Sequence, residues 1–375
     1  MLIKINKNST NSLVNAYLSG DIALFKQLIK DGHDVNCLTS DGFSLISTII
    51  KNGYRINKNK DFFDAMMDAD VHLGTIGREW SLLQSAVFSD DPVYMIGRLL
   101  DNGIDINFIE ERVDERGTSA YKIFPVIFHI LIMGDMNFIE KALKFEPELN
   151  VKRDNGDTIL HFLMTRCECS KNTPAQIYNI MKILIEKGVD LNAKNSKGET
   201  FLHHMPRWVL SSKLLDLLIE NNVDINLPDA NNNSILLKYI KKPNISSIKL
   251  LIRKGADVNF NNGMNSINAI HVAADIGRHD ILKILKDNNA DFSKKNHMLE
   301  NVAHIIAQKP NLTQEDKDFL KENVPLLFDK KINGSTPMDI IKNKHKNLHE
   351  EIIGLIKNDW NSKLAGKFKS NGRSL

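Results

Sequence analysis

The sequence predicts an all-α solenoid, in which short helix-turn-helix units stack along the chain. One observation is a phrase, Gly-x-Asp-aliphatic-Asn or a close variant, with decayed copies ending at residues 72, 150 and 293. Its clearest copies end at Asn36, Asn107, Asn192, Asn226 and Asn259. Successive ends lie 33 to 43 residues apart, which is the period of stacked supersecondary units. A further observation is that apolar residues between the phrases recur at helical spacing.

A second motif marks the start of each predicted helix pair. The stretch 154–161 runs from Asp154 to His161 and matches 195–203, and weaker copies stand at 268–271, 301–304 and 334–338. Thr or Ser ahead of an apolar run can cap a helix through its hydroxyl. A glycine such as Gly188 after the second helix suits a left-handed C-terminal residue. These signals predict about ten helix pairs, beginning near residues 11, 44, 81, 124, 158, 200, 234, 268, 301 and 336.

The predicted domain organisation is a single solenoid over residues 1–360, with the first and last pairs as caps. The last helix fits a cap because 349–357 mixes charges with its apolar stripe. Residues 361–375 hold Lys363, Lys367, Lys369 and Arg373 with no acid, which predicts a basic flexible tail. A translocation signal is the functional alternative for that tail.

The two motifs together resemble the ankyrin repeat, whose signature is Asp-x-x-Gly-x-Thr-Pro-Leu-His, two short helices, then Gly-Ala-Asp-Val-Asn. The resemblance covers about residues 10–358. It implies hairpin fingers between units, and a concave face of fingers and inner helices that binds a protein partner. In the family, the histidine found here at His161, His203, His271 and His304 bonds between adjacent repeats. The resemblance therefore implies a structural role for these histidines.

The composition limits the classes of function that this protein can have. Forty-nine basic against 46 acidic residues leave a net charge of +3, too balanced to predict a nucleic-acid partner. We find no signal peptide, no stretch long enough to span a membrane, and no phosphate-loop, nucleotide-binding or hydrolase motif, so we expect no cofactor. The sequence predicts a soluble cytoplasmic protein, favoured as a monomer. Abundant Lys, Ile and Asn beside diverged repeats resemble effectors of intracellular bacteria, or less closely viral host-range proteins, which implies secretion into a host cytosol.

Two insertions lengthen the repeats. Residues 109–117 are predicted to extend a finger by about one turn of charged chain, and 166–174 to lengthen the link between paired helices. Cys167 and Cys169 in the second insertion, near His161, invite a zinc or thiol-nucleophile interpretation. Their Cys-x-Cys spacing differs from that of common zinc sites, and no second ligand pair is evident. We therefore interpret them as surface thiols in a loop, with no metal site and no catalytic residue.

The candidate partner surface follows from the ankyrin resemblance, which places the positions one, four and five after the motif histidine in the groove. In the middle repeats, this projection places an aromatic anchor, Trp208, beside a row of basic side chains, which we call the basic ladder. In the following repeat it places Val272, Asp275 and Ile276. The candidate residues are Phe162, Arg166, His204, Arg207, Trp208, Lys238, Lys241 and Lys242. Tryptophan and arginine are enriched at interface hot spots, and Pro206 within the predicted inner helix is a further sign of a specialised site.

The primary hypothesis is a non-enzymatic interaction protein whose partner carries an acidic patch around an apolar pocket. Two alternatives stay open at this point. One is an enzyme with a site in 109–117 or 166–174, and the other is an inhibitor that occludes a partner's active site.

Overall fold

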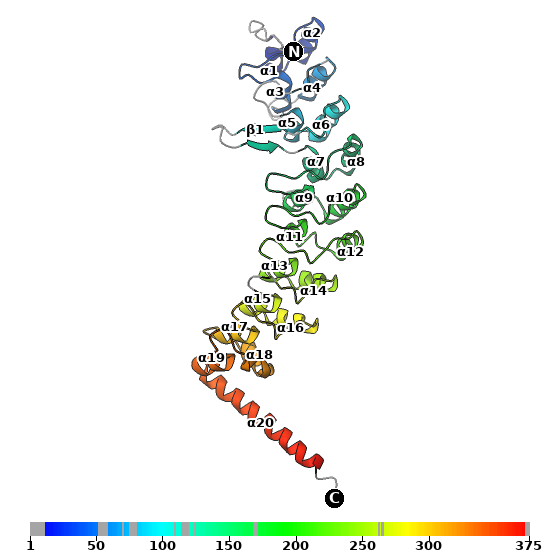
Figure 1. The fold of residues 1–375 in the computed structure, drawn as a ribbon. Coiled ribbons are helices and arrows are strands. Elements are labelled where there is room, and N and C mark those ends of the chain that lie inside the picture. The colour runs from blue at the N-terminus through cyan, green and yellow to red at the C-terminus, as the bar shows by residue number, and fades with distance from the viewer. Residues whose placement is uncertain are drawn as a thin grey trace. The chain divides into compact units, whose positions relative to one another are not determined.

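The computed structural model describes residues 12–51, 59–69, 71–74, 81–108, 110–113, 120–123, 125–167, 172–261, 263 and 266–371. The chain divides into two compact units, Met1–Asp190 and Leu191–Leu375. In each unit, short α-helices follow one another in pairs joined by turns (Figure 1). The described part thus has the all-α repeat architecture that the sequence predicts. None of its helices is both long and apolar enough to cross a bilayer.

Unit 1 consists of helix pairs interrupted by one β-hairpin. Its elements are α1 (Ser12–Leu18), α2 (Ile22–Lys30), α3 (Leu45–Lys51), α4 (Asn59–Met67), α5 (Leu82–Val87), α6 (Pro92–Asp101), β1 (Glu110–Val113), β2 (Ala120–Ile123), α7 (Ile127–Met133), α8 (Met136–Ala142), the 3-10 turn η2 (Leu143–Phe145), α9 (Ile159–Arg166) and α10 (Pro174–Glu186).

Unit 2 repeats the same pairing. Its elements are α11 (Phe201–His204), α12 (Ser212–Glu220), α13 (Ile235–Lys241), α14 (Ile245–Arg253), α15 (Ala269–Asp275), α16 (His279–Asp287), α17 (Val302–Gln308), α18 (Gln314–Glu322), the 3-10 turn η3 (Val324–Phe328), α19 (Pro337–Lys344) and α20 (Lys346–Asn371).

The inner helix of nearly every described pair begins within one residue of the predicted start. The exception is α7, which begins at Ile127 rather than near residue 124. Strand β2 continues to Ile123, and it pairs antiparallel with β1, Glu110 opposite Ile123. The extended finger is therefore a β-ribbon that carries the chain past the expected helix start, and not one added turn. Residues 109 and 114–119 of this insertion lie outside the described part.

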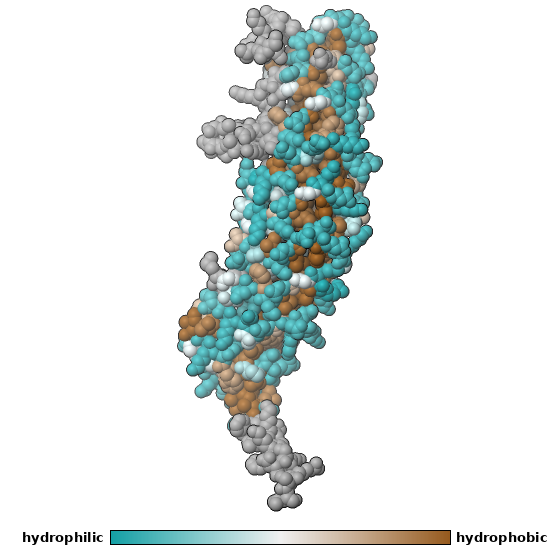
Figure 2. Space-filling view, turned by 45° about the vertical axis from the view of Figure 1, so that its right-hand side comes forward, coloured by the Kyte–Doolittle hydropathy of each residue, from teal (hydrophilic) through white to brown (hydrophobic). Residues whose placement is uncertain are grey.

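Burial explains why the helices stack. The inner helix α3 buries Leu45, Ile46, Ile49 and Ile50 to 1% exposure or less, because its neighbours cover it on several sides. The outer helices instead bury one apolar stripe and leave a polar face, so much of the visible surface is polar with apolar strips between (Figure 2). In unit 2, α13 packs on α15, α15 on α17 and α17 on α19. No pair has enough core to fold alone, so stability comes from its neighbours.

The repeated glycines and capping residues act as predicted. Gly188 and Gly255 follow the second helix of their pairs with φ of +75° and +92°, values that favour glycine. Thr200 and Ser234 stand as N-caps of α11 and α13, in extended backbone conformation. The local sequence therefore sets where each inner helix starts and each outer helix ends.

The Asn that ends each phrase links successive repeats, a role that the sequence reasoning did not assign. In unit 2, the Asn226 side chain donates to the Gly255 carbonyl at 3.1 Å and accepts from the Asp257 N–H at 2.8 Å. Asn192 and Asn259 make the same pair of bonds to their next repeats. In the copies that end in Asn, this side chain holds the loop of the following unit.

Asn226→Ala is therefore expected to lower the free energy of unfolding by about 1–2 kcal/mol, because two exposed hydrogen bonds to backbone groups of the next repeat are lost. Urea unfolding measures the effect. Asn288→Ala is the matched control, since the exposed Asn288 amide bonds only within its own helix, to the Ile284 carbonyl at 2.8 Å. Equal losses in the two variants would contradict a linking role for Asn226.

The last helix is longer than expected. Helix α20 continues to Asn371, so its backbone is helical through most of the segment for which the basic composition predicts a flexible tail. The proposed boundary at residue 360 and the single 1–360 domain stay predictions.

Candidate partner-binding surface

In unit 1, Phe162 belongs to the core. Its side chain is only 6% exposed, and its ring lies 5.6 Å from the rings of both Phe128 and His129. The sequence projection placed Phe162 on the groove, and that placement is wrong because aromatic side chains of α7 cover it. The guanidinium of Arg153 lies 5.4 Å from the Phe162 ring and that of Arg166 5.9 Å. Arg166, at the end of α9, is exposed as expected.

His129, whose ring lies against Phe162, has a strongly lowered pKa. Burial, together with the positive charges of Arg153 and Arg166, lowers its pKa to about 4. Its buried Nδ1 has no hydrogen-bond partner in the described structure. The imidazole is therefore held neutral within the stack at neutral pH.

Cys167 is not a surface thiol, which corrects the interpretation from sequence. It caps the C-terminus of α9, is 1% exposed, and donates its S–H to the Met164 carbonyl at 3.1 Å. Cys169, with residues 168 and 170–171, lies outside the described part.

In unit 2, Pro206 ends an inner helix instead of lying within it. Helix α11 stops at His204, and Met205 takes an extended conformation. A residue before proline disfavours the α conformation, because the pyrrolidine ring crowds it. Arg207 and Trp208 therefore lie in a turn, where the chain re-forms bonds such as Val209 N–H to the Pro206 carbonyl at 3.1 Å. The projection from a continuous helix is wrong for these two residues.

The turn after α11 presents an exposed aromatic side chain. Trp208 is 40% exposed. Arg207 is exposed too, and its guanidinium donates to the Lys242 carbonyl at 2.6 Å, which ties the turn to the end of α13. Behind them, the Tyr239 hydroxyl donates to the Met205 carbonyl at 3.1 Å. The Trp208 ring is thus held on a supported turn with part of its surface open to solvent.

The predicted basic ladder lies on and after α13. Lys238, Lys241 and Lys242 are exposed. Partial desolvation lowers the pKa of Lys238, and the Lys241 ammonium donates to the Asn233 side chain at 2.8 Å. His204, the last candidate, is half-buried and its Nε2 lies 3.0 Å from a Glu199 carboxylate oxygen. Lys241 is thus held by an amide side chain rather than by a carboxylate.

A groove of about 950 Å³ runs beside these residues in unit 2. Inner helices and fingers of successive repeats form its walls. Its lining includes Lys241, Val272, Asp275 and Ile276, all positions that the sequence placed on the groove. Ile276, at the end of α15, is 39% exposed. Lys241 is the one candidate residue in this lining, and His204, Arg207, Trp208, Lys238 and Lys242 of the same unit are not part of it.

The groove also has charged residues that the sequence reasoning missed. Glu300 comes from a finger and pairs with Lys331 at 3.3 Å. Lys309 follows α17 and pairs with the buried Asp316 at 2.9 Å. The sequence projection considered only inner-helix positions at fixed distances after the motif histidine. It therefore could not identify finger residues such as Glu300. With these pairs neutralised, Lys241 and Asp275 are the remaining charges of the lining.

The motif histidines have the structural role that the resemblance implies. The Nδ1 of His203 accepts the N–H of the cap residue Thr200 at 3.1 Å, and its Nε2 lies 3.2 Å from the Asn233 carbonyl of the next repeat. His271 and His304 make equivalent bonds. Since Nδ1 accepts an N–H, the Nε2 nitrogen carries the proton and donates to the carbonyl.

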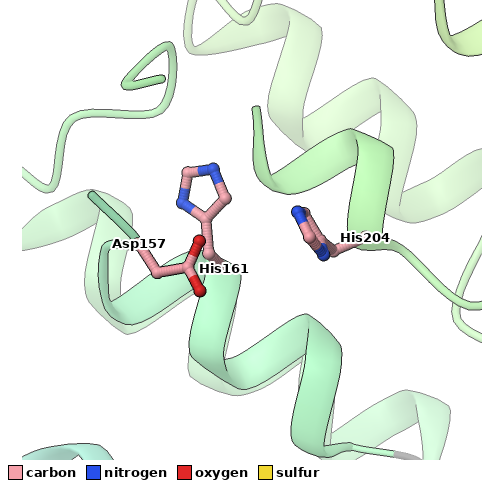
Figure 3. Close-up of side chains that lie close together, drawn as sticks. All are labelled: Asp157, His161 and His204. Carbon is pink, nitrogen blue, oxygen red and sulfur yellow. The ribbon is translucent and has the colours of Figure 1, made fainter. Parts of the chain in front are cut away.

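Burial lowers the pKa of His203, His271 and His304, because the charged form would lose hydration. In unit 1, His161 accepts the Thr158 N–H through Nδ1 at 3.2 Å. Its side chain extends from the start of α9, close to that of Asp157 (Figure 3). These imidazoles are structural groups of the stack.

Comparison with known proteins agrees with this geometry. A family model described as ankyrin repeats (3 copies) matches residues 207–296. An ankyrin repeat protein of Rickettsia bellii is 31% identical over 168 residues, which cover 41% of this chain and 92% of the relative. The chain belongs to the ankyrin-repeat family.

Other ankyrin-repeat relatives are more distant or much longer. One from Acanthamoeba polyphaga mimivirus is 26% identical over 204 residues, 52% of this chain, which spans only 24% of that protein. Among solved structures, the ankyrin repeat domain of Bcl-3, a member of the IkappaB protein family, matches with a TM-score of 0.50 at 19% identity. That match covers 65% of this chain and 99% of the Bcl-3 chain. It shows the shared ankyrin fold.

Proposed function

We propose that this ankyrin-repeat protein is a non-enzymatic interaction module whose protein partner docks in the groove of unit 2. The observation that carries the proposal is the groove itself, about 950 Å³ in volume, with the exposed Ile276 in its lining. A half-exposed aliphatic side chain in a groove rimmed by polar groups is typical of an interaction site. Ankyrin repeats are protein-binding units, which supports the same function.

The partner is proposed to carry an acidic patch beside an apolar contact. Lys241 and Lys242 are exposed, and Lys241 bonds to an amide rather than to a carboxylate, so its positive charge is available to an acidic partner. Arg207 lies against Lys242 and extends the positive surface toward Trp208. Complementary charge of this kind raises association rates and selects among partners.

The setting that best fits this function is the cytosol of a host cell. Relatives come from Rickettsia, whose proteins share the repeats, and from large DNA viruses. We propose that the chain acts as a monomeric effector on a host protein. Affinity capture from host-cell lysate, followed by a search for covalently changed host proteins, separates a binder from an enzyme.

Trp208→Ala is expected to weaken capture of the partner about thirtyfold, because truncating an aromatic anchor commonly costs about 2 kcal/mol or more. Phe328→Ala is the control, since Phe328 is 55% exposed elsewhere in unit 2. Circular dichroism checks the fold of both variants. A Trp208→Ala protein that binds with unchanged affinity, or that melts far below the wild type, would remove Trp208 from the site.

A further inference from the structure

Two opposite charges in the groove of unit 2 stand at the same position of successive inner helices. Lys241 is the last residue of α13 and Asp275 the last of α15, and both line the groove. Gln308 takes the same place at the end of α17. Because α13 packs on α15 and α15 on α17, the groove presents a cation, an acid and an amide in succession along unit 2 (Figure 1).

Lys241 and Asp275 do not neutralise each other. The Lys241 ammonium donates to the Asn233 side chain at 2.8 Å. The Asp275 carboxylate is exposed, and it forms no hydrogen bond or ion pair with the residues that the structure describes. The axes of packed helices lie about 8–10 Å apart, which places charges at equivalent positions at about that separation. Each charge is therefore available to a different group of a ligand.

The cations next to Asp275 are already paired with other acids. Arg278 follows it in the turn after α15, and its guanidinium contacts the Asp280 carboxylate at 2.5 Å. Lys309, which lines the groove from the next repeat, pairs with Asp316 at 2.9 Å. No described cation therefore pairs with the Asp275 carboxylate, and its charge is left for a bound partner.

Aliphatic side chains lie beside these charges. Ile276 follows Asp275 directly and is 39% exposed, and Val272 lies one turn earlier on the same helix. Ile305 of α17 continues the apolar lining. The exposed Asn231 adds a side-chain amide, which can both donate to and accept from a peptide group. A ligand that matches this lining has an apolar contact, both signs of charge and open peptide groups.

We propose that the groove binds an extended segment of the partner protein, with an acidic side chain at Lys241, an aliphatic side chain at Ile276 and a basic side chain at Asp275. The inference rests on the proposed function, and it adds the basic side chain that Asp275 recognises. A separation of about 8–10 Å equals about three residues of extended chain, which advances about 3.3 Å per residue. The acidic and basic residues of the segment therefore lie about two to four positions apart. Two opposite charges beside one apolar contact fix the direction and register of the segment.

Selection of phage-displayed random heptapeptides on the full chain tests the proposal. Seven residues are too few for a stable isolated helix, so the library presents mainly extended peptides. We expect enrichment of peptides that hold an acid and a base about two to four positions apart, together with an aliphatic residue. A synthetic peptide of the enriched sequence, labelled with a fluorophore, is then titrated with the protein. Its affinity should fall as salt is added, because the charged contacts are screened.

Reversal of the acid identifies the peptide residue that Asp275 contacts. Asp275→Lys should weaken the selected peptide about tenfold or more, because two like charges then meet. A peptide whose basic residue is replaced by glutamate should bind Asp275→Lys better than it binds the wild type. Asp287→Lys is the matched control, because Asp287 is an exposed acid of the outer helix α16 and is not part of the groove lining. Circular dichroism checks that both variants are folded.

The outcomes separate this inference from the docking site itself. Enriched peptides that bind the wild type and Ile276→Arg equally well lie outside the groove, which contradicts both proposals. Peptides that lose affinity with Ile276→Arg but not with Asp275→Lys leave the groove as the site and overturn the charge assignment. Equal losses with Asp275→Lys and Asp287→Lys overturn it too. If no heptapeptide is enriched, the extended segment is wrong, and docking of a folded surface remains the proposal for the groove.

Discussion

Ile276→Arg should remove partner capture while leaving the stack folded. Ile276 is 39% exposed in the lining of the groove, so an arginine there places a charge and a longer side chain in the space proposed for the partner. The arginine removes the apolar contact of Ile276 and fills the space of the docked partner, so the expected loss is about 2 kcal/mol or more, roughly thirtyfold in affinity. Quantitative capture from lysate at several protein concentrations measures it.

The matched variant is Ile219→Arg. Ile219 has nearly the same exposure, 38%, but lies on the outer helix α12 and is not part of the groove lining. The two variants add the same charge to the same unit, so non-specific effects of the arginine are equal in both. Similar binding by Ile276→Arg and wild type, or equal loss in both variants, would exclude the groove as the docking site.

Acidification from pH 7 to pH 5 is expected to destabilise the stack, chiefly through His129 in unit 1. When the pKa of a histidine is lower in the folded state than in the unfolded state, protonation costs no stability above about pH 6.5, because the imidazole is neutral in both states. Stability falls as the pH drops toward the folded pKa, because the unfolded chain takes up the proton first. For His129, with a folded pKa of about 4, the loss between pH 6.5 and 4 amounts to about 3 kcal/mol.

His203, His271 and His304 shift in the same direction and add to the loss in unit 2. Carboxylates whose pKa is lowered in the folded state, such as Asp316, affect stability in a more acidic pH range. Their contribution to the free energy of unfolding is lost only as the pH falls below the unfolded pKa near 4. Melting curves between pH 7 and 5 therefore report mainly the histidines. His129→Leu should melt with a smaller pH dependence, and an unchanged dependence would contradict the account of His129.

The sequence predicts most inner-helix starts well because they are marked by local chemistry, which α7 lacks. The cap, the histidine three residues later and the apolar run all lie within one segment, as at Thr200 and His203. The linking role of Asn226 depends on a bond to the next repeat, so it becomes evident only once the units are stacked. Local signals thus set the elements, while contacts between repeats must be seen in three dimensions.

The candidate site was harder to predict because the projection assumed continuous, exposed inner helices. Pro206 ends α11, and a stricter use of the proline rule would have moved Arg207 and Trp208 into a turn. Phe162 is buried by side chains from the preceding pair, which no spacing within its own repeat reveals. Glu300 reaches the groove from a finger, outside the inner-helix positions that were projected.

Photo-crosslinking from position 276 tests the docking site most directly. A photoreactive amino acid replaces Ile276 in one protein and Ile219 in a second, and both are irradiated in host-cell lysate after circular dichroism has shown that they are folded. The groove account predicts a discrete covalent adduct with one protein from position 276, absent from position 219 and competed by unlabelled wild type. An adduct from position 219 alone, or the same adducts from both positions, would contradict it.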